Sequence, residues 1–189
     1  MLVLASASPR RQEILRNAGV DFTVEPAHIP EEAIEGESAK VLAQRLAREK
    51  ALAIAHRQIG AYVLGADTVV SVDDEIFGKP ADSADAARML RKLAGRNHEV
   101  ITGVCLVPPG KLDAPDTRSQ ITQVTFEAIT QKEIEDYVAS GEPMDKAGAY
   151  AIQGIASRWI SRIEGDYFNV VGLPIALVFE MLKDNGWTP

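Results

Sequence analysis

The segment at residues 62–72 constrains the fold most strongly, because it is an almost unbroken apolar run in the middle of the chain. Its sequence, YVLGADTVVSV, is rich in β-branched residues, which favours a strand covered on both faces. Elsewhere, strand-like runs alternate with helix-like segments, and short turns join several of the expected strands. These features predict an α/β fold with a mixed central sheet and flanking helices, rather than a purely parallel sheet.

Turn and capping residues set the bounds of the expected elements. Ser8, Ser38 and Ser83 are the expected N-caps, and Thr130 with Glu133 is expected to form a capping box. Strands are predicted at residues 2–5, 20–24, 62–72, 75–77, 99–107 and 120–128, with a hairpin at 164–166. Helices are predicted from residue 9 to the closing Gly19, and at 39–57, 83–93, 130–140 and 174–185.

Composition limits the class of protein. The chain has 189 residues, enough for one domain spanning residues 1–189 with its own core. A net charge of −7 argues against a nucleic-acid binder, whose surface is normally basic. The single cysteine, Cys105, excludes an internal disulfide and multi-cysteine zinc sites, and it favours a reducing compartment. With no signal-like leader and no apolar run long enough to span a bilayer, we expect a cytoplasmic protein.

An unusual charge pattern marks the start of the first predicted helix. Ser8 and Pro9 are typical of an N-cap and the first helical residue, and Arg10 and Arg11 then occupy the first turn. Cations there oppose the helix dipole, where a carboxylate would gain roughly 0.3–1 kcal/mol. Because the strand at residues 2–5 leads through a tight turn into this helix, its amides and guanidinium groups are expected to face an anion such as phosphate.

Asp67 is the most informative single position in the chain. It lies inside the apolar run at residues 62–72, where an unpaired buried carboxylate would be strongly destabilising. We therefore expect it to meet a metal ion or a cation, or to act as a base, and the neighbouring Gly65 allows a ligand or backbone to approach closely. The alternative is a structural aspartate at a strand end that accepts hydrogen bonds from backbone amides.

Three lysines are candidates for phosphate contacts. Lys50 falls between the apolar clusters of its predicted helix, so it either extends its amine to the helix edge or directs it into a cleft. Lys79 and Lys146 lie in loops of small or rigid residues, with the sequences GKP and DKAGAY, that leave an ammonium accessible. Glycine-framed lysines also occur in ordinary turns, so neither loop alone identifies a function.

Acidic residues in the loop that begins at residue 31 supply further candidates. Glu31 and Glu32 are most simply explained as a solvated charge run. If the ligand is a polyphosphate, it requires a divalent cation such as Mg²⁺ or Mn²⁺, and Asp67 with one of these glutamates offers suitable oxygen ligands. The sequence contains no Walker A, G-x-S-x-G or G-x-G-x-x-G motif.

Taken together, the motifs point to a known family. They are SASPRR at residues 6–11, LAREKA at 46–51, GADTVV at 65–70, GKP at 78–80, DKAGAYAIQG at 145–154 and VGLP at 171–174. In this order they closely resemble the Maf family of nucleoside triphosphate pyrophosphatases. The resemblance implies a mixed α/β fold with two lobes around a cleft, similar to the inosine triphosphatases. It also implies hydrolysis of a nucleoside triphosphate to the monophosphate and pyrophosphate, with a divalent metal cation, Mg²⁺ or Mn²⁺, as cofactor.

The resemblance implies roles for individual residues. Asp67 corresponds to the essential acidic residue and Glu31 to the glutamate beside the metal, so the implied metal ligands are this pair. Because Pro30 stands where the family often has an acidic residue, Glu32 is the alternative to Glu31. The implied catalytic residues are Asp67, Lys50 and Lys79, and the expected substrate-binding residues are Ser8, Arg10, Arg11, Thr68, Lys146 and Gln153.

Three positions distinguish branches of the family, and here they are Arg10, Thr68 and Gln153. This combination resembles the dTTP/UTP branch rather than the branch that acts on 7-methyl-GTP. The Gln153 amide offers one acceptor and two donors, which match the N3–H and O4 edge that uracil and thymine share. Arg10 thus has two interpretations, a phosphate contact and a specificity contact.

The implied mechanism is attack of water on the α-phosphorus while the metal, the arginines and the lysines take up charge. Asp67 either holds the metal or accepts the proton. A competing hypothesis is a non-catalytic nucleotide- or nucleic-acid-binding regulator of septum formation, against which the net charge of −7 and the buried Asp67 argue. A purely structural interpretation leaves the paired arginines unexplained. The expected partners are a nucleoside triphosphate but neither membrane nor nucleic acid, and a homodimer stays open.

Overall fold

The structure is a computed structural model that describes residues 1–187. Its strands are β1 (Leu2–Leu4), β2 (Phe22–Val24), β3 (Tyr62–Val72), β4 (Glu75–Phe77), β5 (Asn97–Val107), β6 (Asp116–Phe126) and β7 (Ile160–Glu164). Its α-helices are α1 (Pro9–Asn17), α2 (Ala39–Ala55), α3 (Ser83–Leu93), α4 (Gln131–Ala139), α5 (Tyr167–Val171) and α6 (Ile175–Asp184). Short 3₁₀ helices lie at Glu142–Asp145, Ala147–Ala149 and Ile155–Trp159. None of the helices within residues 1–187 has the length and apolar character needed to cross a bilayer.

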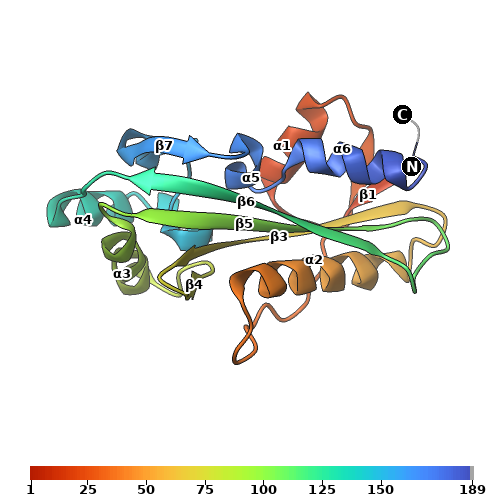
Figure 1. Cartoon of the computed structure of the whole chain (residues 1–189), viewed down its shortest axis with the longest axis horizontal. Coiled ribbons are helices and arrows are strands. Elements are labelled where there is room, and N and C mark those ends of the chain that lie inside the picture. The colour runs from red at the N-terminus through yellow and green to blue at the C-terminus, as the bar shows by residue number, and fades with distance from the viewer. Residues whose placement is uncertain (188–189) are drawn as a thin grey trace. The chain divides into compact units, whose positions relative to one another are not determined.

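The strands form one mixed sheet, as predicted (Figure 1). Hydrogen-bonded neighbours follow the order β2-β1-β3-β5-β6-β7, with β4 paired to β3. β1 is parallel to both β2 and β3, whereas β4 is antiparallel to β3 and β7 is antiparallel to β6. The α/β class with flanking helices is therefore confirmed.

Two details of the predicted elements are wrong. The N-cap of α3 is Asp82 and not Ser83, because the Asp82 carboxylate accepts a hydrogen bond from the Asp85 amide at 2.8 Å. The expected hairpin at residues 164–166 does not form. The Asp166 carboxylate instead accepts a hydrogen bond from the Phe168 amide at 2.7 Å, and the chain enters the short helix α5.

The chain divides into two compact units. Unit 1 contains Met1–Asp67, Thr102–Gln120 and Gly172–Pro189, and unit 2 contains Thr68–Ile101 and Ile121–Val171. The three long strands β3, β5 and β6 each contribute residues to both units.

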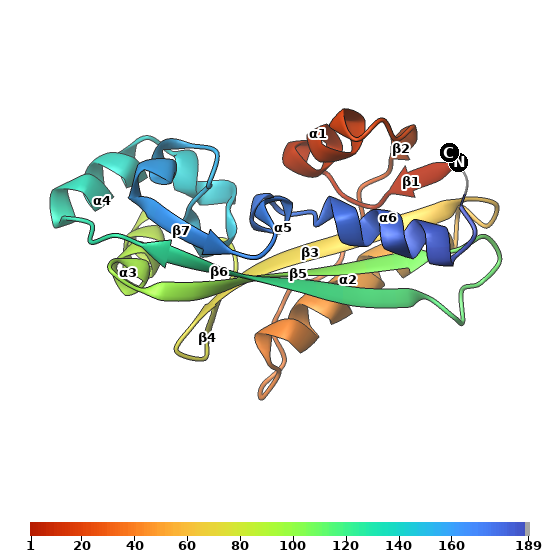
Figure 2. The same cartoon turned by 45° about the horizontal axis from the view of Figure 1, so that its top comes forward.

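In unit 1, α2 packs directly on the backbone of the sheet. Its small and branched residues form a buried cluster with β1, β3 and β5. Gly65 of β3 allows this approach, because a Cβ at this position would overlap with the backbone of Ala47. Gly103 of β5 meets the backbone of Ala43 in the same way. The helices α1 and α6 lie on the opposite side of these strands (Figure 2).

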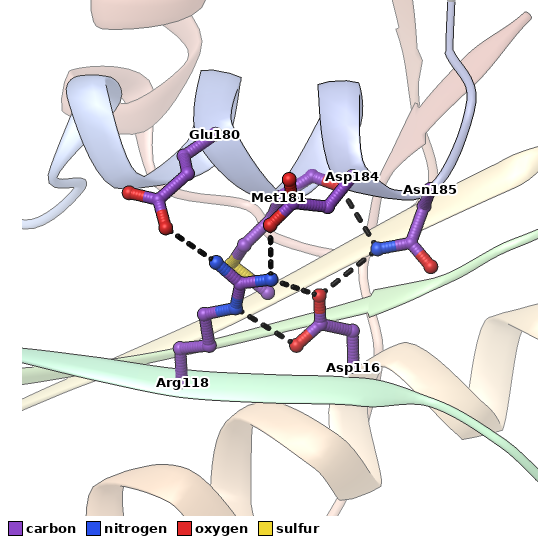
Figure 3. A network of polar contacts seen from close by, with 6 residues as sticks. All are labelled: Asp116, Arg118, Glu180, Met181, Asp184 and Asn185. Carbon is purple, nitrogen blue, oxygen red and sulfur yellow. Dashed lines mark hydrogen bonds and ion pairs between the residues drawn. The ribbon is translucent and has the colours of Figure 1, made fainter.

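A polar network joins α6 to β6 in unit 1 (Figure 3). The Arg118 guanidinium donates to both Asp116 carboxylate oxygens, at 3.0 and 2.9 Å. It also donates to Glu180 at 2.8 Å and to Asp184 at 2.6 Å, and both residues belong to α6. The Asn185 amide adds a hydrogen bond to Asp116 at 2.9 Å. These carboxylates raise the pKa of Arg118, and the network fixes the C-terminal helix to the sheet.

In unit 2, α3, α4 and the 3₁₀ helices cover one face of the strands. The buried cluster there is aromatic, and includes Phe77, Phe126, Tyr137, Tyr150 and Trp159. His98 of β5 is buried beside it, with its ring edge-on to two of these rings, and its Nε2 lies 2.7 Å from the hydroxyl of Tyr150. This cluster anchors the loops that carry the candidate residues of unit 2.

Candidate active site

Lys50 and Asp67 form a buried ion pair in unit 1. Lys50 lies on the sheet-facing side of α2, and the close approach of this helix at Gly65 brings its amine to the middle of β3. The Lys50 Nζ is 2.6 Å from Asp67 Oδ1, and each residue is only 7% exposed. Lys50 thus directs its amine inward, and among residues 1–187 the carboxylate of Asp67 bonds to a cation rather than to backbone amides. Pairing of this kind offsets the large cost of burying either charge alone.

Glu31 completes a cluster of two carboxylates around one ammonium. It belongs to the loop between β2 and α2, and its Oε1 lies 2.5 Å from the Lys50 Nζ. Its side chain is 43% exposed, so the cluster is buried on the Asp67 side and open on the Glu31 side. Glu32, the alternative ligand, contributes its backbone carbonyl to Arg45 at 2.9 Å and is exposed.

A second ion pair holds the loop that carries Glu31. Arg45 of α2 donates to both carboxylate oxygens of Glu37 at 2.8 Å, and to Glu49 at 3.2 Å. The bonds from Arg45 lower the pKa of Glu37, which therefore stays ionised. Because Arg45 also binds the carbonyl of Glu32, this pair fixes the backbone next to Glu31.

The start of α1 has the predicted cap. The Ser8 hydroxyl accepts a hydrogen bond from the Arg11 amide at 3.5 Å, and the Ser6 hydroxyl accepts one from the Ser8 amide at 3.2 Å. Arg10 and Arg11 follow in the first turn, both half-buried, and that turn contains no acidic residue. The cationic helix start expected from the sequence is therefore present, although the two serine hydroxyls already accept hydrogen bonds from two of the backbone amides there.

Arg11 makes bonds that the sequence did not predict. Its guanidinium donates to the carbonyl of Gly172 at 2.8 Å, to the carbonyl of Ala66 at 2.8 Å and to the Ser6 hydroxyl at 3.2 Å. Burial lowers the pKa of Arg11, while the nearby charge of Asp67 acts in the opposite direction. Arg11 thus holds the backbone next to Asp67. No side-chain pattern could have shown this, because two of its partners are backbone carbonyls.

The remaining candidates belong to unit 2. Thr68 is its first residue and is half-buried, and Lys79 lies exposed in the turn after β4. The amide of Gly148 donates to the carbonyl of Gly78 at 3.0 Å, which brings the loop of Lys146 beside the loop of Lys79. The Lys146 ammonium bonds within its own loop, to the Glu142 carbonyl at 2.5 Å and to Asp145 at 2.6 Å. Gln153 is exposed between two 3₁₀ helices.

The donor set in unit 1 suits a hard divalent cation only in part. Asp67 and Glu31 each place a carboxylate oxygen next to the same nitrogen, at 2.6 and 2.5 Å from the Lys50 Nζ. Within residues 1–187, no three His, Cys, Asp or Glu side chains are grouped closely enough to hold a metal ion by themselves. Mg²⁺ is commonly held by one or two carboxylates together with the phosphates of a substrate, and this donor set fits that mode rather than an all-protein cage.

Comparisons with known proteins cover nearly the whole chain. Residues 1–185 match the family described as Maf-like protein. The chain is 56% identical over 185 residues to a dTTP/UTP pyrophosphatase of Koribacter versatilis, covering 98% of this chain and 94% of that protein. It is 52% identical to a dTTP/UTP pyrophosphatase of Geobacter metallireducens, with 98% and 96% covered. Among solved structures, the Ham1 protein of Staphylococcus aureus aligns with 97% of this chain and 98% of its own, at a TM-score of 0.46 and 12% identity.

Proposed function

This chain belongs to the family of Maf-like proteins, and from that membership we propose that it hydrolyses dTTP and UTP to the nucleoside monophosphate and pyrophosphate. Relatives of about the same length, up to 56% identical, carry the name dTTP/UTP pyrophosphatase. The observation that carries the proposal is the cluster of Lys50, Asp67 and Glu31, buried on the Asp67 side, in which two carboxylates suited to a metal ion lie beside an ammonium suited to phosphate. This reaction would remove nucleoside triphosphates from the nucleotide pool, so the protein would be a hydrolase of nucleotide metabolism.

We propose that unit 1 carries the phosphate chemistry. Asp67 and Glu31 would hold a divalent cation, Mg²⁺ or Mn²⁺, which when bound neutralises phosphate charge and polarises the α-phosphate. Lys50 then donates to phosphate oxygens and takes up charge as the α–β bond breaks. Asp67 is also suited to accept the proton of the attacking water.

Other charged residues would bind the polyphosphate. Arg10 and the Ser8 cap present the positive end of α1, and Arg11 adds charge while it holds Ala66. From unit 2, Lys79 and Lys146 are proposed phosphate contacts, for which Lys146 would exchange its bonds within the loop.

Arg10, Thr68 and Gln153 are the proposed specificity residues. The exposed Gln153 amide is able to donate to O4 and accept from N3–H, the edge that uracil and thymine share. A site that reads this edge by paired hydrogen bonds discriminates strongly against bases that lack it.

Product analysis tests the reaction. Purified protein with Mg²⁺ is incubated separately with dTTP, UTP, CTP, GTP, ATP and 7-methyl-GTP. Monophosphate and pyrophosphate from dTTP and UTP are expected, whereas diphosphate and phosphate would contradict the proposed bond, and no turnover would contradict the function.

Asp67→Asn tests the site. It should lower turnover by about 10²-fold or more, since both roles proposed for Asp67 need the carboxylate. Asp113→Asn, at an exposed position, is the matched control and should leave turnover unchanged. Retained activity in Asp67→Asn would remove Asp67 from the site.

The compartment, the domain organisation and the partners of the enzyme are also proposals. We place it in the cytoplasm as one domain spanning residues 1–189, acting on a nucleoside triphosphate without a membrane or nucleic-acid partner. A homodimer is compatible with this proposal, and light scattering at micromolar concentration measures the oligomeric state.

A further inference from the structure

The ammonium of Lys50 occupies the space between the two proposed metal ligands. Its Nζ is 2.6 Å from Asp67 Oδ1 and 2.5 Å from Glu31 Oε1, so both carboxylates bond to the same nitrogen. The side chains of Lys50 and Asp67 are only 9% and 10% exposed, which limits screening of their charges by solvent. The Lys50 ammonium therefore already occupies the carboxylate oxygens that a divalent cation would need as ligands.

A metal ion and this ammonium would exclude each other. A divalent cation bound to Asp67 and Glu31 would lie beside the Lys50 Nζ, and two like charges repel most strongly where water is scarce. No third acidic, histidine or cysteine ligand is grouped with these two carboxylates in the described part of the chain, so the protein offers little to offset that repulsion.

A polyphosphate changes this balance. Its oxygens accept hydrogen bonds from the ammonium and also coordinate the metal, so it offers Lys50 a new partner while completing the metal's shell. The flexible stem of lysine and its three rotatable donors allow such an exchange without movement of α2.

We infer that Lys50 is an internal counter-cation that keeps free metal out of the Asp67–Glu31 pair until a nucleoside triphosphate arrives. The metal therefore enters together with the polyphosphate, and the protein alone binds it weakly. This inference rests on the proposed function for the identity of the polyphosphate. It adds that Lys50 couples metal binding to substrate binding, and by thermodynamic linkage each ligand must strengthen the other equally.

Binding of Mn²⁺ to the full-length protein, followed by electron paramagnetic resonance, tests the inference without any turnover. Wild-type protein should bind Mn²⁺ weakly alone, and about tenfold or more tightly with the non-hydrolysable α,β-methylene analogue of UTP. Lys50→Met and Lys50→Gln should each bind Mn²⁺ alone about tenfold or more tightly than wild type, whereas Lys50→Arg, which keeps the cation, should not. Lys50→Gln keeps a hydrogen-bond donor for Asp67, so it still tests the inference where Lys50→Met fails to fold.

Two controls assign the effect to this cluster. Lys40→Met removes an exposed ammonium from the same helix and should leave Mn²⁺ binding as in wild type. Adding Asp67→Asn to Lys50→Met should abolish the gain, and a gain that survives would place the Mn²⁺ elsewhere and overturn the inference.

Unchanged or weaker Mn²⁺ binding in folded Lys50→Gln also overturns it, as does an absence of coupling between Mn²⁺ and the analogue in wild type. If the predicted Mn²⁺ affinities are observed but no nucleotide is hydrolysed, the proposed function fails and the counter-cation role stands. If dTTP and UTP are hydrolysed but the Lys50 variants do not gain Mn²⁺ affinity, only the counter-cation role fails.

Discussion

At the scale of single residues, Arg11 links three segments of unit 1. Its bonds to Ser6, Ala66 and Gly172 join the β1–α1 turn, the middle of β3 and the segment before α6. Ala66 directly precedes Asp67, so this guanidinium fixes the backbone from which the carboxylate extends. Hydrogen bonds from a charged donor are among the stronger polar interactions in a fold.

Arg11→Ala should therefore lower both stability and turnover. Loss of its bonds should cost roughly 2–3 kcal/mol of unfolding free energy, and displacement of Asp67 should lower kcat roughly 10- to 100-fold with a smaller change in KM. Denaturant unfolding and steady-state kinetics measure the two effects, with Arg16→Ala on the exposed part of α1 as control. A raised KM with an unchanged kcat would instead identify Arg11 as a pure phosphate ligand.

His98 should make folding sensitive to mildly acidic pH. Burial lowers its pKa from 6.5 to about 4, so it stays neutral in the folded protein while the unfolded chain takes up a proton. As the pH falls from about 6.5 to about 4, its contribution to unfolding free energy should decrease by about 3 kcal/mol.

The measurement is urea unfolding of wild type and His98→Phe from pH 8 to pH 4. The variant loses the bond to Tyr150 and should be less stable at pH 8, but its stability should depend less on pH. His28→Gln, at an exposed position, should keep the wild-type slope. Parallel slopes for wild type and His98→Phe would contradict the prediction.

The sequence predicts which residues need partners better than it predicts the partners. Asp67 stands out because a carboxylate in an apolar strand needs a cation, and the structure supplies one. The helical pattern alone left Lys50 undecided, since its direction depends on how closely α2 approaches the sheet. The choice of Glu31 over Glu32 at the cation also depends on the loop fixed by Arg45, which local sequence does not encode.

At the scale of elements, the fold was most predictable where capping and periodicity agree. The bounds of β3 and the caps of α1, α2 and α4 match the prediction because apolar runs and capping side chains act locally. The hairpin predicted at residues 164–166 failed because the Asp166 carboxylate binds the Phe168 amide, a local alternative that also suits a helix start.

The packing of α2 on β3 gives a prediction at this scale. Gly65→Ala would place a Cβ against the backbone of Ala47 and Ala51, and should cost about 1–3 kcal/mol as the helix moves outward. Because Lys50 lies on that turn of α2, the shift should also lengthen its contact with Asp67 and lower kcat.

Gly103→Ala is the matched control for this prediction. Its Cβ would meet the same helix at Ala43, away from Lys50, so a similar loss of stability should come with a smaller loss of kcat. Chemical denaturation and kinetics on both variants make the comparison. Equal losses of kcat would show that α2 shifts as a rigid whole, without a local effect on the ion pair.

At the scale of the whole molecule, the two units share strands but have separate cores. The core of unit 1 is built from small and branched residues under α2, whereas that of unit 2 is rich in aromatic rings. β3, β5 and β6 run through both, so loss of either core removes the packing that keeps these strands ordered for the other. This continuity favours a single cooperative unfolding transition.

The two tryptophans test this directly, because Trp159 belongs to unit 2 and Trp187 to unit 1. Trp187→Phe leaves a probe in the buried cluster of unit 2, and Trp159→Phe leaves one after α6. Fluorescence-monitored unfolding of each variant should give the same denaturant midpoint as the circular dichroism of that variant. If the two methods disagree within one variant, the units unfold independently, and the proposal of one domain spanning residues 1–189 is wrong. Coincident transitions would mean that a core mutation such as Leu90→Ala in unit 2 also destabilises the Lys50–Asp67 pair of unit 1, because folding of either unit then requires the other.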